Sequence, residues 1–151
     1  MFDIRPCTQA DLPAVRDLMR ELAEAATPAV EFSLDDMART FADLERHPDL
    51  YLNLVAVVEG QVVAFISLIF YETLFHAGGT ALINELIVTG RRRRQGIGCA
   101  LVERARAEAV ARGTDELEVA TELDNQRARD FYRGCGFDQE YVLFGLEFDQ
   151  G

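Results

Sequence analysis

The junction at residues 83–101, where an apolar strand runs through a basic turn into a helix, most constrains what this chain can fold into. The turn holds Arg91 to Arg94 and is followed by Gly96 and Gly98. A helix N-terminus presents backbone N–H groups at the positive end of the helix dipole, which suits an anion such as phosphate. Glycine lets the backbone reach positive φ and approach a ligand closely. The junction therefore predicts a phosphate-binding site.

Two common phosphate motifs do not describe this junction. A dinucleotide-binding G-x-G-x-x-G needs a third glycine where the chain has Leu101, and no Gly-Lys-Ser/Thr follows to make a Walker A loop. The alternative is a solvated basic turn that only caps the helix. The two glycines and the arginines alone leave both interpretations open.

The bulk composition is typical of a globular protein. The chain has 151 residues, of which 49% are hydrophobic and 27% charged, so we expect residues 1–151 to form a single domain with a real core. No apolar run approaches the ~18 residues of a membrane span, and the N-terminus lacks the pattern of a signal peptide. Three scattered cysteines do not make a disulfide framework. These features predict a cytoplasmic protein with no membrane partner.

The net charge of −11 argues against nucleic acid as a general partner, because nucleic-acid binders carry a basic face. It does not exclude a local anion site, since distant surface charges are screened beyond about 8 Å. A nucleic-acid binder that uses Arg91 to Arg94 stays an alternative, although the prediction is that nucleic acid is not a partner.

Hydrophobic periodicity and turn residues predict the order β-α-α-β-β-β-α-β-α-β. The first helix is expected to start at Asp11 as N-cap and to break at Thr27-Pro28, and Ser33 is expected to cap the second helix. The first hairpin implies antiparallel pairing, whereas the later strand–helix alternation implies parallel pairing. A mixed α/β sheet with helices on both faces follows. The expected strands are 2–7, 52–58, 62–71, 81–88, 117–121 and 142–148, and the later helices are 34–47, 95–112 and 125–134.

Two stretches of this chain resemble signatures of the GNAT superfamily of acetyl-CoA-dependent N-acetyltransferases. The first is Arg93-x-x-Gly96-x-Gly98 after the strand end Leu86-Ile87-Val88, although Gly90 stands where the family usually has proline. The second is an Asn-x-x-Ala-x-x-Phe-Tyr-x-x-x-Gly-Phe pattern, matched by Asn125, Ala128, Phe131, Tyr132, Gly136 and Phe137. The order of elements resembles that fold from end to end.

The resemblance implies a mixed sheet that splays between its fourth and fifth strands, with acetyl-CoA bound as cosubstrate. The pantetheine arm would lie in the gap near Val88, and the pyrophosphate would lie on the amides from Arg93 to Gly98. No metal is expected. The cofactor-binding residues implied are Leu86, Ile87, Val88, Arg93, Arg94, Gln95, Gly96, Ile97, Gly98 and Asn125.

Transfer of an acetyl group to an amine needs a neutral amine and a stabilised thiolate. Glu85 is the candidate base, because strand alternation puts it beside Ile83 and Ile87, where partial desolvation would raise its pKa. Tyr132 matches the family's catalytic tyrosine and is the candidate acid for the thiolate. The alternatives are a structural carboxylate at position 85, a packed aromatic ring at 132 and a simple helix cap at Asn125.

The function implied by the resemblance is transfer of an acetyl group from acetyl-CoA to a primary amine of a small molecule or peptide, by direct attack in a ternary complex. A non-catalytic acyl-CoA-binding regulatory domain is the alternative. The first two helices are rich in acidic residues, which suits a cationic amine but does not identify it. The apolar segment Tyr141 to Phe148 is expected to be an edge strand, through which a homodimer could form.

Overall fold

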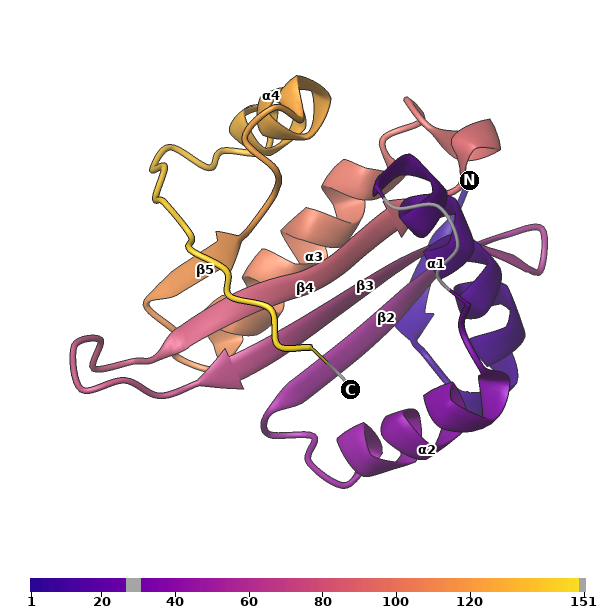
Figure 1. Ribbon diagram of the computed structural model, residues 1–151, viewed down its shortest axis with the longest axis horizontal. Coiled ribbons are helices and arrows are strands. Elements are labelled where there is room, and N and C mark those ends of the chain that lie inside the picture. Colours follow the sequence, from indigo (N-terminus) through magenta and orange to yellow (C-terminus); the bar gives the residue numbers. More distant parts are fainter. Residues whose placement is uncertain (27–30, 150–151) are drawn as a thin grey trace. The chain divides into compact units, whose positions relative to one another are not determined.

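The computed structural model describes residues 1–26 and 31–149, which divide into two compact units, Met1–Val119 and Ala120–Gly151 (Figure 1). The first unit contains a five-stranded sheet and three α-helices, and the second contains one α-helix. The break that the sequence predicted at Thr27-Pro28 lies outside the described residues.

The sheet has the strand order β1-β2-β3-β4-β5. The first four strands pair antiparallel, and β4 pairs parallel with β5. The mixed α/β sheet predicted from the sequence is therefore confirmed. The β2–β3 hairpin closes at Glu59 and Gly60, which both have positive φ (50° and 77°), as a type I′ turn requires. The strands are β1 (Asp3–Pro6), β2 (Tyr51–Val58), β3 (Gln61–Tyr71), β4 (Thr80–Val88) and β5 (Glu116–Val119).

Helices cover both faces of the sheet, as predicted. On one face, α1 (Leu12–Ala26) and α2 (Leu34–Glu45) share a buried apolar cluster with side chains that include Val55, Phe65 and Ile87. The residues that alternate with these along the strands, such as Leu54 and Ile66, are fully buried too. These alternating residues point to the other face of the sheet, where the helix α3 (Ile97–Ala111) packs against the strands (Figure 1).

The strands β4 and β5 diverge where the resemblance predicted a splay. Parallel pairing of β4 with β5 runs from Thr80–Glu116 to Ile83–Val119 and ends there. The strand β4 continues for five more residues, to Val88, paired on its other side with β3. One edge of β4 between Asn84 and Val88 is thus beyond the reach of the β5 ladder.

A β-bulge interrupts β4 at this point. Ser67 pairs with Glu85 and the next residue, Leu68, pairs with Ile83, so Asn84 is the extra residue. Successive residues of a strand point to opposite faces, and paired residues share a face. Ile83 therefore lies on the face opposite to Glu85, and the prediction that it flanks Glu85 is wrong because the bulge breaks the alternation.

The helix α1 begins at Leu12, directly after Asp11, where the sequence predicted its start. A short 3-10 turn (Gln9–Asp11), with Thr8 as its N-cap, leads into it. The Asp11 carboxylate accepts hydrogen bonds from the Thr8 N–H and hydroxyl, at 2.8 and 3.0 Å, and pairs with Arg5. At α2 the prediction is confirmed, since the Ser33 hydroxyl accepts the Asp36 N–H.

The prediction of a last strand at residues 142–148 is wrong. Residues 138–149 form no strand, and the apolar side chains there are exposed, with Phe144 at 91%. Alternation of apolar residues is only half of what a strand needs, because its backbone must also find a ladder partner. The edge strand on which the homodimer prediction rested is not formed.

The α-helices of the described chain, 1–26 and 31–149, are all too short or too polar to cross a bilayer. The longest, α1 and α3, have 15 residues each.

Candidate active site

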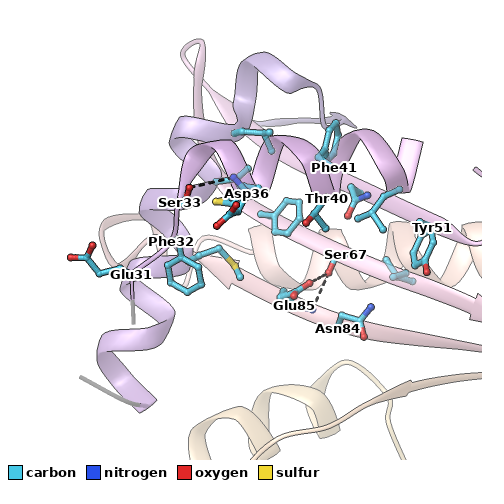
Figure 2. Close-up of a pocket in the computed structure, with 18 residues that line it drawn as sticks. Glu31, Phe32, Ser33, Asp36, Thr40, Phe41, Tyr51, Ser67, Asn84 and Glu85 are labelled. Carbon is cyan, nitrogen blue, oxygen red and sulfur yellow. Dashed lines mark hydrogen bonds between the residues drawn. The ribbon is translucent and has the colours of Figure 1, made fainter. Parts of the chain in front are cut away.

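A cavity of about 390 Å³ lies between α1, α2 and the sheet in the first unit (Figure 2). This volume falls within the range of small-molecule sites, roughly 300–1,000 Å³. Its walls are mainly apolar, and its polar groups include Asn53, Ser67, Asn84 and Glu85 from the sheet and Thr40 from α2. The cavity is a pocket for an organic molecule with a few fixed polar contacts.

Glu85 lies in the wall of this cavity, held by Ser67 on the neighbouring strand (Figure 2). The Ser67 hydroxyl donates to Glu85 Oε2 and accepts the Glu85 backbone N–H at 3.1 Å. The bulge at Asn84 makes this pairing possible, because it leaves the Glu85 N–H to a side chain instead of a ladder carbonyl. Ser67 thereby fixes both the backbone and the carboxylate of Glu85.

Burial raises the pKa of the Glu85 carboxyl above its ordinary value. Desolvation disfavours the charged form, which makes the carboxylate a stronger base than an exposed glutamate. A carboxylate with this property in the wall of a pocket is suited to accept a proton from a bound molecule.

Between Glu85 and the end of β4, the side chains are wholly or partly buried, so the main chain is the part of the strand most available to a ligand. The Ile87 side chain is buried in the core cluster with Val55 and Phe65, and Leu86 and Val88 are half-buried. A ligand in the splay would therefore contact the main chain of these residues, as an added strand does.

The strand–helix junction has the predicted positive φ at one of its two glycines. Gly98 lies inside α3 and is not among the glycines with positive φ. Gly96 is the N-cap of α3 with φ = 80°, and Ala100 makes the first bond of the helix, to the Gly96 carbonyl, at 3.0 Å. The amides before Ala100 precede that ladder, including those of Ile97 and Gly98. A Cβ added at Gly96 would meet no described atom within 4 Å, so the space beside the helix end is open to a ligand.

The preceding turn presents its side chains to solvent. Arg93, Arg94 and Gln95 are exposed, and Arg94 has a φ of 62°, which is uncommon for a residue other than glycine. Arg93 is extended, and its Nε reaches the Val88 carbonyl at 3.4 Å. The turn thus folds back on the end of β4 and leads directly into the α3 N-terminus.

A carboxylate from α1 fastens this turn, and sequence reasoning missed it. Glu21 Oε1 accepts the Thr89 hydroxyl at 2.8 Å, and Oε2 accepts the Gly90 N–H at 3.0 Å. Glutamate on a helix is common, so only the tertiary contact identifies its role. A second carboxylate contacts the same turn: Glu59 in the β2–β3 hairpin lies 3.6 Å from the guanidinium of Arg92, measured between oxygen and nitrogen.

The second unit contains the two other predicted site residues. Asn125 caps α4 (Gln126–Gly134), because its side-chain oxygen accepts the Ala128 N–H at 3.1 Å. Tyr132 lies between Phe131 and Phe137, with edge-to-face contacts at centroid distances of 5.2 and 5.6 Å. The structural roles considered as alternatives are therefore both present: Asn125 is a helix cap, and Tyr132 is a packed aromatic ring.

Burial, with a smaller effect of Cys135, raises the pKa of the Tyr132 phenol to about 12. The hydroxyl consequently keeps its proton at neutral pH and is available as a hydrogen-bond donor. Packing of the ring does not occupy the hydroxyl, so the structural role and a role as donor are compatible.

The sequence matches known acetyltransferases along most of its length. The model of the Acetyltransferase (GNAT) family matches residues 14–137. The aminoalkylphosphonate N-acetyltransferase of Salmonella typhimurium is 31% identical over 142 residues, covering 94% of this chain and 88% of that protein. The phosphinothricin N-acetyltransferase of Streptomyces viridochromogenes is 28% identical over 149 residues, covering 99% and 81%.

The fold is similar to that of a solved acetyltransferase structure. The crystal structure of glucosamine-6-phosphate N-acetyltransferase from Arabidopsis thaliana superposes with a TM-score of 0.84 at 20% identity, covering 99% of both chains. At this identity the likeness speaks for the fold alone. The family match and the similarity of the Salmonella protein cover far more than half of the chain, and together they show that this protein is an acetyltransferase of the GNAT family.

Proposed function

We propose that this enzyme transfers an acetyl group from acetyl-CoA to a primary amine of a small molecule or peptide, by direct attack in a ternary complex. The observation that carries the proposal is the course of β4. The strand places Glu85 in the wall of an organic-molecule pocket and ends, three residues later, at the turn that leads into the α3 N-terminus. One strand thus connects an amine site with a phosphate site.

In this proposal acetyl-CoA binds along the splay and the junction. Its pantetheine arm pairs with the main chain of Leu86, Ile87 and Val88, and its pyrophosphate lies on the amides of residues 93–98, with Arg93, Arg94 and Gln95 at the entrance. The positive φ of Gly96 and the open space beside it support this placement. Asn125 contributes a further contact to the pantetheine through its side-chain nitrogen, while its side-chain oxygen caps α4.

Glu85 is the base in the proposed reaction. An alkylammonium has a pKa near 10.4, so removal of its proton at pH 7 costs about 3 units, or roughly 4–5 kcal/mol. The desolvated Glu85 carboxylate accepts this proton, directly or through a water molecule, and the neutral amine attacks the thioester carbonyl. The C–S bond then breaks, its electron pair leaves with the sulfur of CoA, and the nitrogen loses its second proton, which ends on the thiolate to give the free thiol of CoA.

Tyr132 stabilises that thiolate. A phenol with a pKa of about 12 is a weaker acid than an alkyl thiol, whose pKa is near 8.5, so full proton transfer to the thiolate is unfavourable. We therefore assign to Tyr132 a charge-assisted hydrogen bond to the departing sulfur, which lowers the barrier without complete transfer.

The relatives support an amine acceptor, since one is named for an aminoalkylphosphonate and the other for phosphinothricin. We also propose that residues 1–151 act as a single N-acetyltransferase domain. In support, the family match at residues 14–137 runs across the division between the two compact units.

A thiol-release assay with acetyl-CoA and a panel of primary amines tests the proposal. The chain has no lysine, so self-acetylation at lysine cannot contribute to the signal. We expect amine-dependent release of CoA together with an acetylated amine. An upward shift of the melting temperature by acetyl-CoA without turnover of any amine would instead indicate the acyl-CoA-binding regulatory domain.

A further inference from the structure

The residues that line the Glu85 cavity indicate which chemical groups the amine substrate carries besides its amino group. Its walls combine side chains from both helices and the sheet, among them Met19, Phe32, Met37 and Phe65. Figure 2 shows Phe32 and Phe41 on the helix side and the Ser67–Glu85 pair on the sheet side. Apolar walls of this kind favour an aliphatic or aromatic body, because burial of apolar surface contributes about 25 cal/mol per Å².

The charges that line the cavity have one sign. Its charged lining residues among the described parts of the chain are Glu31, Asp36 and Glu85, and the lining includes no arginine. The sequence holds no lysine at all, and residues 27–30 are Thr, Pro, Ala and Val. The walls described here offer an anionic group of the substrate no cationic partner.

Arg39, next to Thr40 on α2, is not among the residues that line the cavity. Its guanidinium pairs with the lining carboxylate of Asp36, and its side chain is 73% exposed. An anionic group that leaves water without a cationic partner is disfavoured, and the lining carboxylates would add repulsion. An ammonium group, in contrast, finds the Glu85 carboxylate at the sheet side of the cavity.

We infer that the acceptor is a primary amine on an apolar, uncharged body, such as an alkylamine or arylalkylamine, and that amines with a phosphonate or carboxylate group are disfavoured. The inference rests on the proposed function, because it assigns the Glu85 cavity to the amine. It separates this enzyme from its Salmonella relative, which is named for an aminoalkylphosphonate.

Matched pairs of amines test the inference: 2-phenylethylamine against phenylalanine, and propylamine against 3-aminopropylphosphonate. Binding to the full chain is measured by calorimetry in the presence of CoA, which cannot react, and turnover is measured with acetyl-CoA. We expect the uncharged member of each pair to bind tighter by about tenfold or more, as an unpaired buried anion implies. Equal or tighter binding of the anionic members, or no binding of any amine, would overturn the inference.

Binding and turnover separate this inference from the proposed function. If the uncharged amines bind selectively but no acetylated product forms, the inference about the cavity stands and the proposed reaction falls. If turnover occurs but favours the anionic amines, the reaction stands and the inference falls.

A substitution on α2 locates the preference in the cavity. Thr40 is exposed and lines the cavity, so Thr40→Arg adds the missing cation while Thr40→Gln adds length without charge. We expect Thr40→Arg to reduce the discrimination against phenylalanine by about tenfold relative to Thr40→Gln, as a new charge pair in a partly buried site would. Equal discrimination in the two variants would place the amine elsewhere and contradict the inference.

Discussion

Glu21 on α1 holds Gly90 at the end of β4, with its carboxylate accepting the Gly90 N–H at 3.0 Å. The other oxygen of the same carboxylate accepts the Thr89 hydroxyl at 2.8 Å. Proline, which the family usually has at this position, has no N–H to donate. Glycine at position 90 therefore allows a contact that ties α1 to the start of the turn proposed to bind phosphate.

We predict that Glu21→Gln raises the KM for acetyl-CoA by roughly three- to tenfold, because one of two hydrogen bonds to a charged acceptor is lost, a loss of about 1 kcal/mol or more. The KM for the amine should change little. Steady-state kinetics with each substrate varied in turn checks this. Glu24→Gln, at an exposed position one turn further along α1, is the matched control. If Glu21→Gln lowers the melting temperature but leaves both KM values unchanged, Glu21 has only a structural role.

Gly96 and Gly113 provide a second matched pair, at the two ends of α3. Both have positive φ, 80° and 78°, and a Cβ at either position would meet no described atom within 4 Å. Alanine at either site should therefore destabilise the fold by a similar amount, about 1 kcal/mol. Only Gly96→Ala should weaken acetyl-CoA binding, by about tenfold or more, since only its Cβ enters the proposed phosphate site. Calorimetric titration of both variants decides, and equal affinity would contradict the placement of the pyrophosphate.

The Arg5–Asp11 pair predicts a pH dependence of stability. The hydrogen bond from Arg5, more than any other contact, lowers the pKa of Asp11 from 3.8 to about 2. A depressed pKa gives stability that is present above the unfolded pKa and is lost as the pH falls from about 4 to 2. Since the Asp11 side chain is only 8% exposed, the contribution is on the order of 2 kcal/mol.

Urea unfolding of Asp11→Asn from pH 7 to pH 2.5 measures this contribution. The variant should be less stable at pH 7, and its difference from the wild type should shrink steadily below about pH 4. Asp17→Asn, at a carboxylate on α1 that is 68% exposed, is the control and should run nearly parallel to the wild type. A constant difference between Asp11→Asn and wild type at every pH would show that the ion pair is not the cause.

Tyr132→Phe separates packing from chemistry. The substitution keeps the ring contacts with Phe131 and Phe137 and removes only the hydroxyl. We expect turnover to fall by roughly ten- to a hundredfold, with the affinity for acetyl-CoA retained, because the lost hydrogen bond acts on the departing thiolate. Single-turnover kinetics together with calorimetry measures both quantities. A variant as active as the wild type would leave Tyr132 with a packing role alone.

Local signals predicted most of the fold. The caps at Ser33 and Asn125, the turn at Glu59-Gly60 and the end of α3 at Gly113 each depend on a few neighbouring residues, and all were confirmed. The strand expected at residues 142–148 failed because pairing depends on a distant partner, which periodicity does not report.

In the candidate site, too, the residues marked by local motifs were predicted, and those that depend on tertiary contacts were not. Its glycines and strand end were predicted from motif spacing. The supports of those residues, Ser67 for Glu85 and Glu21 for Gly90, are contacts across 18 and 69 residues of chain. No local pattern marks a serine or a glutamate for such a role. The bulge at Asn84, which reversed the expected side for Ile83, likewise arises from how two strands align.

The pH–rate profile of Glu85→Gln tests the central claim most directly. A base acts in its deprotonated form, so kcat/KM of the wild type should rise with pH through the pKa of Glu85, which lies above its ordinary value of 4.5 because of burial. In Glu85→Gln this inflection should disappear and kcat/KM near neutral pH should fall by about 10²–10³. Glu31→Gln, at another carboxylate of the same cavity, should keep the inflection. An unchanged inflection and a rate within about twofold of wild type in Glu85→Gln would contradict the account.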